Sequence, residues 1–161
     1  MIRPAQANEA AQVRDVVLAA YRHYVPVIAR PPAPMLDDYV ARIAAGQVWV
    51  LDDAGALTGV LVLEDGPDCF MLENIAVRPD RQGMGCGRIL LDFTEAEAAR
   101  RGWNTVALYT NALMVKNISI YAGRGYVECE RRTERGFDRV YMVKRLERSP
   151  RDRGSRHEGS A

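Results

Sequence analysis

The chain has few cysteines, no long hydrophobic run and almost no net charge, and each shortage excludes a class of protein. Its three cysteines, Cys69, Cys86 and Cys129, are widely spaced without a C-x-x-C pair, so we expect free thiols and no metal site. No apolar run approaches the roughly 20 residues that span a bilayer, and residues 1–4 lack the apolar core of a signal peptide. The net charge of +1 gives no global attraction for nucleic acid or anionic lipid. We therefore expect a cytoplasmic protein with no membrane partner.

Two common phosphate-binding motifs are also absent. No Gly-Lys-Ser/Thr occurs, which excludes a Walker loop, and the glycines after the strand at 71–77 are spaced G-x-G-x-G, which does not match the dinucleotide fingerprint G-x-G-x-x-G. These glycines, Gly83, Gly85 and Gly87, are followed by a helical pattern. The first N–H groups of a helix lack backbone partners and attract anions, and glycines allow a phosphate to approach them closely. The segment therefore predicts a site for a phosphate-bearing ligand, although a plain strand-to-helix turn is the alternative.

Two motifs resemble those of the GNAT superfamily of N-acetyltransferases. The run Gln82 to Gly87 reads Q-x-x-G-x-G directly after V-R-P-D-R, like the acyl-coenzyme A signature of that family. About 30 residues later, Asn117 to Tyr126 resembles the family element N-x-x-[AS]-x-x-x-Y-x-x-x-G-[FY], with imperfect spacing after the asparagine. The resemblance covers Ile2 to about Leu146 and implies acetyl-CoA as co-substrate without a metal. It implies cofactor-binding roles for Ile75, Ala76, Val77, Gln82, Gly83, Met84, Gly85, Cys86, Gly87, Arg88, Asn111 and Asn117.

The catalytic candidates are a carboxylate and a phenol. An alkylammonium has a pKa near ~10.4 and a thiol near ~8.5, so acetyl transfer from a thioester to an amine benefits from a base and a proton donor. Glu73 is in an apolar strand, where a carboxylate is costly unless it is solvated or paired; alternation predicts that it shares a face with Ile75 and Val77. The resemblance implies Glu73 as base and Tyr121 as acid. A surface or ion-paired glutamate and a core tyrosine remain the alternatives.

The acceptor side carries weaker signals. By analogy with the family, it is built from the segment after the first helix and from the last hairpin turn, with substrate-binding candidates His23, Tyr24 and Arg30. Arg30 with Arg132 and Arg135 is a hypothetical receptor for a carboxylate on the acceptor, although scattered arginines are usually solvated. The identity of the amine stays open, as does homodimer formation.

The periodicity predicts one α/β (α+β) domain over residues 1–147. Its order is β-α-α-β-β-β-α-β-α-β-β, in a GNAT-like mixed, mostly antiparallel sheet of about six to seven strands flanked by about four helices. Strands are expected at 2–5, 47–51, 57–64, 69–77, 105–110, 126–132 and 139–144, and helices at 8–24, 37–45, from the glycine loop to about 101, and at 116–123. The stripe Ile89, Leu90, Phe93 and Ala96 is expected to be buried, and four prolines predict an irregular segment at 25–34. Residues 148–161 are expected to be a flexible polar tail.

Together these features predict an N-acetyltransferase that moves an acetyl group from acetyl-CoA to a primary amine of a small molecule or peptide by direct attack. One alternative is a non-catalytic acyl-CoA-binding module. A nucleic-acid role for the arginines of the tail is the weakest alternative, since the run is short and interrupted by acidic residues.

Overall fold

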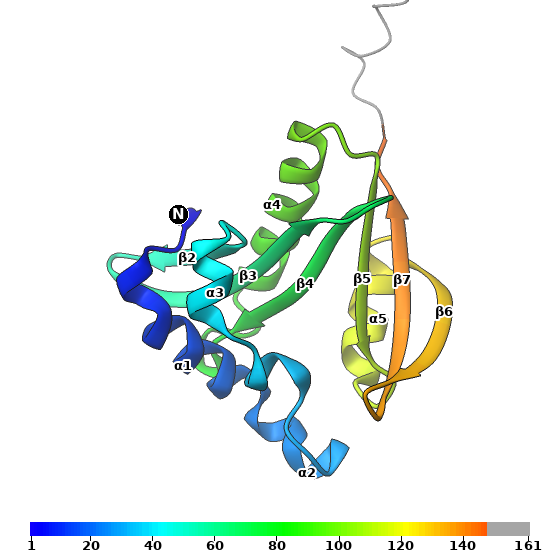
Figure 1. Ribbon diagram of the computed structural model, residues 1–161, viewed down its shortest axis with the longest axis horizontal. Coiled ribbons are helices and arrows are strands. Elements are labelled where there is room, and N and C mark those ends of the chain that lie inside the picture. Colours follow the sequence, from blue (N-terminus) through cyan, green and yellow to red (C-terminus); the bar gives the residue numbers. More distant parts are fainter. Residues whose placement is uncertain (148–161) are drawn as a thin grey trace, which may run out of the picture.

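The protein, analysed as a computed structural model that describes residues 1–147, is built around one seven-stranded sheet with the order β1-β2-β3-β4-β5-β7-β6 (Figure 1). Only the β4–β5 pair is parallel among these neighbours. The mixed, mostly antiparallel sheet confirms the predicted fold class. The predicted tail at 148–161 lies outside the described residues. The strands are β1 (Ile2–Pro4), β2 (Val48–Asp53), β3 (Ala56–Asp65), β4 (Phe70–Val77), β5 (Thr105–Asn111), β6 (Val127–Glu134) and β7 (Phe137–Arg145).

Helices cover both faces of the sheet (Figure 1). One hydrophobic cluster joins α1 and α3 to one face, and a second joins α4 and α5 to the other. The α-helices are α1 (Ala10–Tyr21), α2 (Val25–Ile28), α3 (Tyr39–Ala44), α4 (Cys86–Arg100) and α5 (Val115–Gly123).

The buried face of α4 differs from the predicted one. Of the predicted stripe, Leu90 is buried and Phe93 packs against the core, but Ile89 is 49 % exposed and Ala96 is also exposed. The buried positions of α4 are Leu90, Leu91, Thr94, Glu97 and Ala98. This stripe still has helical spacing, but it is shifted by about one residue along the helix. The packing of α4 against the sheet decides which face is buried, and the local sequence pattern contains no information about that packing.

The proline-rich segment contains a helical turn that the sequence did not predict. Pro26 lies in the first turn of α2, where a missing N–H costs nothing, and the turn ends at Ala29 in the left-handed conformation (φ 64°). Prolines therefore start this short helix as well as limiting it.

Strands β4 and β5 separate along their length, as Figure 1 shows. Their register has only three residue pairs, Phe70 with Val106, Met71 with Ala107 and Leu72 with Leu108. Beyond Leu72 the two strands diverge, and the sheet opens into a wedge. This wedge positions the candidate site.

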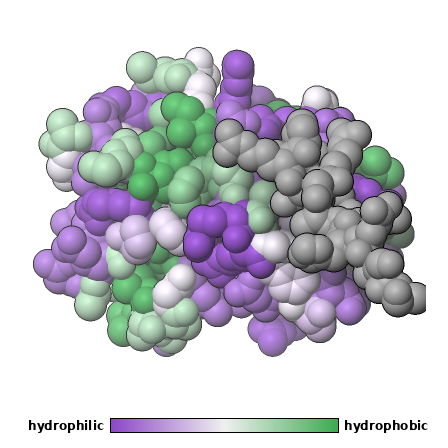
Figure 2. Space-filling view, turned by 90° about the horizontal axis from the view of Figure 1, so that it is seen from above, coloured by the Kyte–Doolittle hydropathy of each residue, from purple (hydrophilic) through white to green (hydrophobic). Residues whose placement is uncertain are grey.

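The surface seen from above carries a band of hydrophobic side chains between hydrophilic ones (Figure 2). Exposed apolar side chains such as Val40 (68 %) are ordinary for a folded protein. Within residues 1–147, no helix combines the length and the apolar character needed to cross a bilayer.

Candidate active site

The glycine loop forms one wall of a first cavity of about 530 Å³. Gly83 (φ 76°) and Gly85 (φ 85°) adopt the left-handed conformation that favours glycine, and α4 begins directly after Gly85. The Gln82 side-chain amide donates to the carbonyl of Val77 (3.1 Å), which ties the loop to the end of β4. Of the predicted cofactor residues, those lining this cavity are Ile75, Ala76, Val77, Gln82, Gly83, Gly85, Gly87, Arg88 and Asn117.

Four other predicted site residues lie at positions that differ from the predicted ones. Met84 is 67 % exposed and Cys86 packs against the hydrophobic core, so neither side chain lines the first cavity. His23 and Tyr24, predicted for the acceptor side, line this first cavity beside the glycine loop. Two basic residues, Arg88 and Lys116, line the first cavity.

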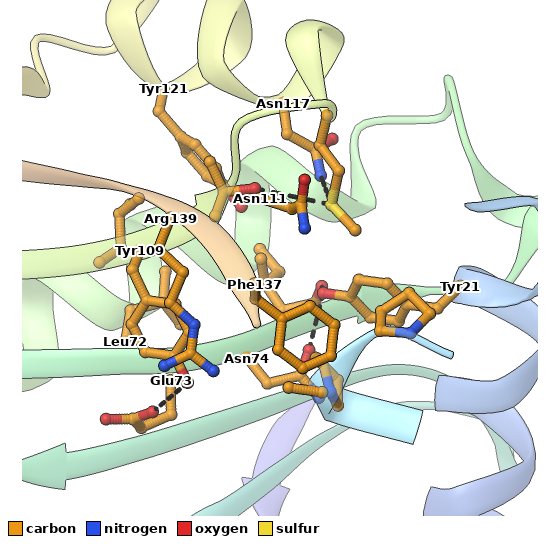
Figure 3. Close-up of a pocket in the computed structure, with 17 residues that line it drawn as sticks. Tyr21, Leu72, Glu73, Asn74, Tyr109, Asn111, Asn117, Tyr121, Phe137 and Arg139 are labelled. Atoms are coloured by element: carbon orange, nitrogen blue, oxygen red, sulfur yellow. Dashed lines mark hydrogen bonds between the residues drawn. The ribbon is translucent and has the colours of Figure 1, made fainter. Parts of the chain in front are cut away.

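A small central cavity of about 50 Å³ occupies the wedge between β4 and β5 (Figure 3). Tyr121 reaches it from α5 and Glu73 reaches it from β4. Tyr121 and Asn117 also line the first cavity, so the two cavities share walls. The wedge therefore brings together the two predicted catalytic residues, which are 48 positions apart in the chain.

Glu73 owes its orientation to a β-bulge. On β3, Val62 pairs with Asn74 and Leu63 pairs with Leu72, so Glu73 is the extra residue of β4. The predicted strict alternation is therefore wrong at this point. Leu72 belongs to the cluster on the α4 side, whereas the Asn74 side chain bonds to tyrosines of α1 and α3, on the opposite side of the sheet.

The carboxyl group of Glu73 is half-buried and hydrogen-bonded. Its Oε2 accepts a hydrogen bond from the Tyr109 hydroxyl at 2.9 Å. Burial and the neighbouring Glu64 carboxylate raise the pKa of Glu73 to about 7, although the Tyr109 hydrogen bond and the charge of Arg42 act in the opposite direction. A carboxyl group with this pKa can accept a proton at neutral pH and release it again.

Tyr121 carries the second functional group of the wedge. Its side chain is buried, with its ring edge-on to Tyr126 at 6.1 Å between centroids. Burial raises the pKa of Tyr121 well above its ordinary value, so the hydroxyl keeps its proton at neutral pH. It can therefore act as a proton donor.

The two asparagines have different surroundings. The Asn111 side-chain oxygen accepts from the Leu113 backbone N–H (2.9 Å), which stabilises the turn before α5. Asn117 lies in α5, and its amide donates to the Met114 sulfur (3.6 Å). Asn111 lines the central cavity, whereas Asn117 lines the central and the first cavity.

A network of side chains that the sequence analysis missed lies at the free edge of β4. The Tyr21 hydroxyl is 2.9 Å from both the Asn74 side-chain oxygen and the Ile75 carbonyl oxygen, and donates to this pair. The Asn74 amide donates to the Tyr39 hydroxyl (3.2 Å), which in turn donates to the carbonyl of Pro34. Tyr21 and Tyr39 match the apolar stripes of their helices, so no local signal separates them from ordinary core residues.

A second, larger cavity of about 720 Å³ adjoins the other side of Glu73 and Tyr109. Arg30 lines it, with its guanidinium 3.4 Å from the centre of the Phe137 ring. Arg135 lines it too, whereas Arg132 stacks on Tyr141 (4.2 Å) and does not line the cavity. Among residues 1–147, no group of three or more His, Cys, Asp or Glu side chains has an arrangement suited to a metal ion.

Comparisons with solved structures identify the same fold in known acetyltransferases. The ribosomal-protein-S18-alanine N-acetyltransferase from Escherichia coli has 22% identity and a TM-score of 0.72, over 92% of this chain and 95% of that one. The PaiA N-acetyltransferase from Thermoplasma acidophilum, solved in complex with coenzyme A, has 16% identity and a TM-score of 0.77, over 91% and 98%. The IAA acetyltransferase from Bacillus cereus has 20% identity and a TM-score of 0.66, over 91% and 99%. At these identities the likeness shows the fold alone.

The sequence comparison shows the family. No curated protein matches the chain significantly. A family model described as an acetyltransferase (GNAT) domain matches residues 44–128, which is more than half of the chain and includes β4, the glycine loop, β5 and α5. The predicted resemblance is confirmed: the chain belongs to the GNAT acetyltransferase family and is an acyltransferase.

Proposed function

We propose that this protein transfers an acetyl group from acetyl-CoA to a primary amine of a small molecule or peptide by direct attack. One observation carries the proposal: the central cavity in the wedge between β4 and β5 shares Asn117 and Tyr121 with the glycine-loop cavity and shares Glu73 and Tyr109 with the second cavity, so it lies at the junction of the two. The thioester and the amine must meet at such a junction, with a proton acceptor beside the amine and a proton donor beside the sulfur.

The first cavity suits the coenzyme. The N-terminus of α4 offers unpartnered N–H groups to a diphosphate, next to glycines whose positive φ angles shape the loop. Arg88 and Lys116 add positive charge at the same wall. Beyond Leu72, the edge of β4 has no β5 partner, so its backbone polar groups can bind the amides of the pantetheine arm. Bound here, the coenzyme supplies an activated acetyl thioester.

Glu73 and Tyr121 divide the proton transfers. Glu73 accepts a proton from the ammonium of the acceptor, directly or through water, which frees the amine lone pair. The amine nitrogen then forms a bond to the acetyl carbon while the carbon–sulfur bond breaks. Tyr121 gives its hydroxyl proton to the departing sulfur, and the acylated nitrogen loses its second proton to solvent as the amide forms. Tyr121 then regains a proton from solvent and Glu73 releases to solvent the one it accepted, so charge and atoms balance.

The test is calorimetric titration of the protein with acetyl-CoA, with NAD and ATP as controls, followed by measurement of free thiol released with a panel of primary amines. We expect saturable binding of acetyl-CoA alone and thiol release that requires an amine. Absence of acetyl-CoA binding by the folded protein would overturn the proposal. Thiol release that no amine accelerates would also contradict amine acetylation.

A further inference from the structure

The charged side chains of the second cavity are not all paired. Arg42 forms ion pairs with Asp37 (2.9 Å) and Glu64 (3.1 Å). Arg139 pairs with Glu134 at 2.8 Å. The acidic groups that line the cavity, apart from the half-buried Glu73, are therefore already bound to arginines of the same wall.

Arg30 lies in the same cavity, and no acidic side chain within residues 1–147 forms an ion pair with it. Among residues 1–147, its guanidinium makes one hydrogen bond, from Nη2 to the backbone carbonyl of Arg135 (2.6 Å), and its Nε is buried with no acceptor. Stacking on Phe137 fixes the plane of the guanidinium. A buried N–H without an acceptor is costly, and a planar guanidinium held in one orientation binds carboxylates well.

The hairpin between β6 and β7 is shaped to accommodate Arg30. Gly136 has a φ of 79°, and a side-chain carbon there would come within 3.0 Å of Arg30 Nη1. Arg135, the preceding residue, also has a positive φ (49°), and its side chain adds a second cation to the cavity with no ion pair among the described residues. The charge left over in this part of the cavity is positive.

We propose that the second cavity selects an acceptor that carries a carboxylate as well as the primary amine, with Arg30 as the residue that binds the carboxylate and Arg135 in support. This inference rests on the proposed N-acetyltransferase function and narrows its substrate class. A polyamine would place a second ammonium beside two unpaired arginines, whereas Asp37 and Glu134, which could attract it, are neutralised by Arg42 and Arg139. A free amino acid and the acidic end of a peptide share the required chemistry.

The experiment compares probes that differ only in the carboxylate. The first arm takes amino carboxylates of increasing length, from glycine to 6-aminohexanoate, against their primary amides, and the second takes the dipeptide amides Ala-Glu-NH2 and Ala-Gln-NH2. For each pair, kcat/KM is measured by thiol release at saturating acetyl-CoA. The N-acetylated forms of the same probes are titrated against the protein with coenzyme A present, which measures binding without turnover.

In the wild type we expect at least one carboxylate probe to exceed its amide by about tenfold or more in kcat/KM and in binding, because a charge-assisted hydrogen bond contributes about that much. Arg30→Gln should abolish the preference, because it lowers kcat/KM for the carboxylate probe by far more than for its amide. Arg30→Lys should restore part of it, and Arg135→Gln should reduce it. Arg131→Gln is the matched control, since Arg131 is on β6, pairs with Glu128 and does not line the cavity.

The inference would be overturned if kcat/KM were equal for the carboxylate and the amide of every pair, or if no carboxylate probe bound. It would also be overturned if Arg30→Gln kept the preference for the carboxylate. Acetylation of amides without a carboxylate preference would overturn it while leaving the proposed function intact. If no probe is acetylated, the proposed function fails for these amines, and the binding titration alone decides whether Arg30 binds carboxylates. The arm that shows the preference distinguishes a free amino acid from a peptide.

Discussion

The charge state of Glu73 determines how the proposed reaction depends on pH. Burial and Glu64 raise its pKa to about 7, so the proton-accepting form becomes populated as the pH rises through this value. We predict that kcat/KM rises about tenfold per pH unit below 7 and levels off above it. In Glu73→Gln the activity should fall by about 10²–10⁴-fold and lose this acidic limb. A pH–rate profile at fixed ionic strength tests this; an unchanged limb in the variant would remove Glu73 as base.

The same pKa shift makes Glu73 a source of instability at alkaline pH. A carboxyl whose pKa rises from 4.5 in the unfolded chain to about 7 in the folded protein binds its proton more tightly when folded. The free energy of unfolding therefore falls as the pH rises from about 4.5 to 7 and is then constant. We predict that Glu73→Gln is more stable than the wild type by about 1–2 kcal/mol at pH 8 and equal to it near pH 4. Urea unfolding at both pH values measures the difference; stabilisation of the same size at both would contradict the assignment.

Tyr121 can be separated from an ordinary buried tyrosine by comparison with its neighbour. The hydroxyl of Tyr126 is also buried, without a hydrogen-bond partner among residues 1–147, but Tyr126 lines none of the three cavities. We predict that Tyr121→Phe lowers kcat by about 10²-fold with little change in acetyl-CoA affinity, because only the proton donor is lost. Tyr126→Phe should leave kcat unchanged. Equal effects of the two substitutions would indicate a packing role for Tyr121.

At the scale of elements, hydrophobic periodicity in the sequence was enough to predict most of the helices and strands. The seven strands and the order of the strands and of helices α1, α3, α4 and α5 follow from hydrophobic periodicity and are confirmed, whereas the short helix α2 was not predicted. The bulge at Glu73 was not predictable in this way. It arises from the register between β3 and β4, and a single strand contains no information about which of its residues lacks a partner.

Gly85 links the conformation of the loop to the coenzyme. An alanine at φ 85° is strained by about 1 kcal/mol, and its side-chain carbon would enter open space at the first cavity. Gly55, in the β2–β3 turn, has a similar φ of 92° and equally open surroundings, but it does not line a cavity. We predict that Gly85→Ala and Gly55→Ala lose similar stability in thermal unfolding, whereas only Gly85→Ala weakens acetyl-CoA binding, by about tenfold or more. If Gly85→Ala bound acetyl-CoA with unchanged affinity, the glycine loop would not be part of the coenzyme site.

At the scale of the whole molecule, the site depends on contacts that the order of residues does not reveal. Tyr109 meets Glu73 across 36 positions, and Arg30 meets the carbonyl of Arg135 across 105. A family motif supplied Tyr121, and the family resemblance together with its place in an apolar strand supplied Glu73, but Tyr109, Tyr21 and Arg139 match ordinary strand or helix patterns. The positions of Tyr109 and Arg139 follow from the sheet order β4-β5-β7-β6, which brings the last hairpin opposite the proline-rich segment, whereas Tyr21 is positioned by the packing of α1 on the sheet.

The wedge also predicts how the coenzyme stabilises the molecule. Beyond three residue pairs, β4 and β5 are not joined by backbone hydrogen bonds, so a ligand in the wedge should tie together parts of the sheet that are otherwise separate. At 100 times its Kd, acetyl-CoA should add about 2.7 kcal/mol and raise Tm by about 5–10 °C. Hydrogen exchange should show new protection at 75–77, in the glycine loop and in α5, which line the first cavity, and little change in β1. Protection confined to other elements, with the same rise in Tm, would place the coenzyme elsewhere.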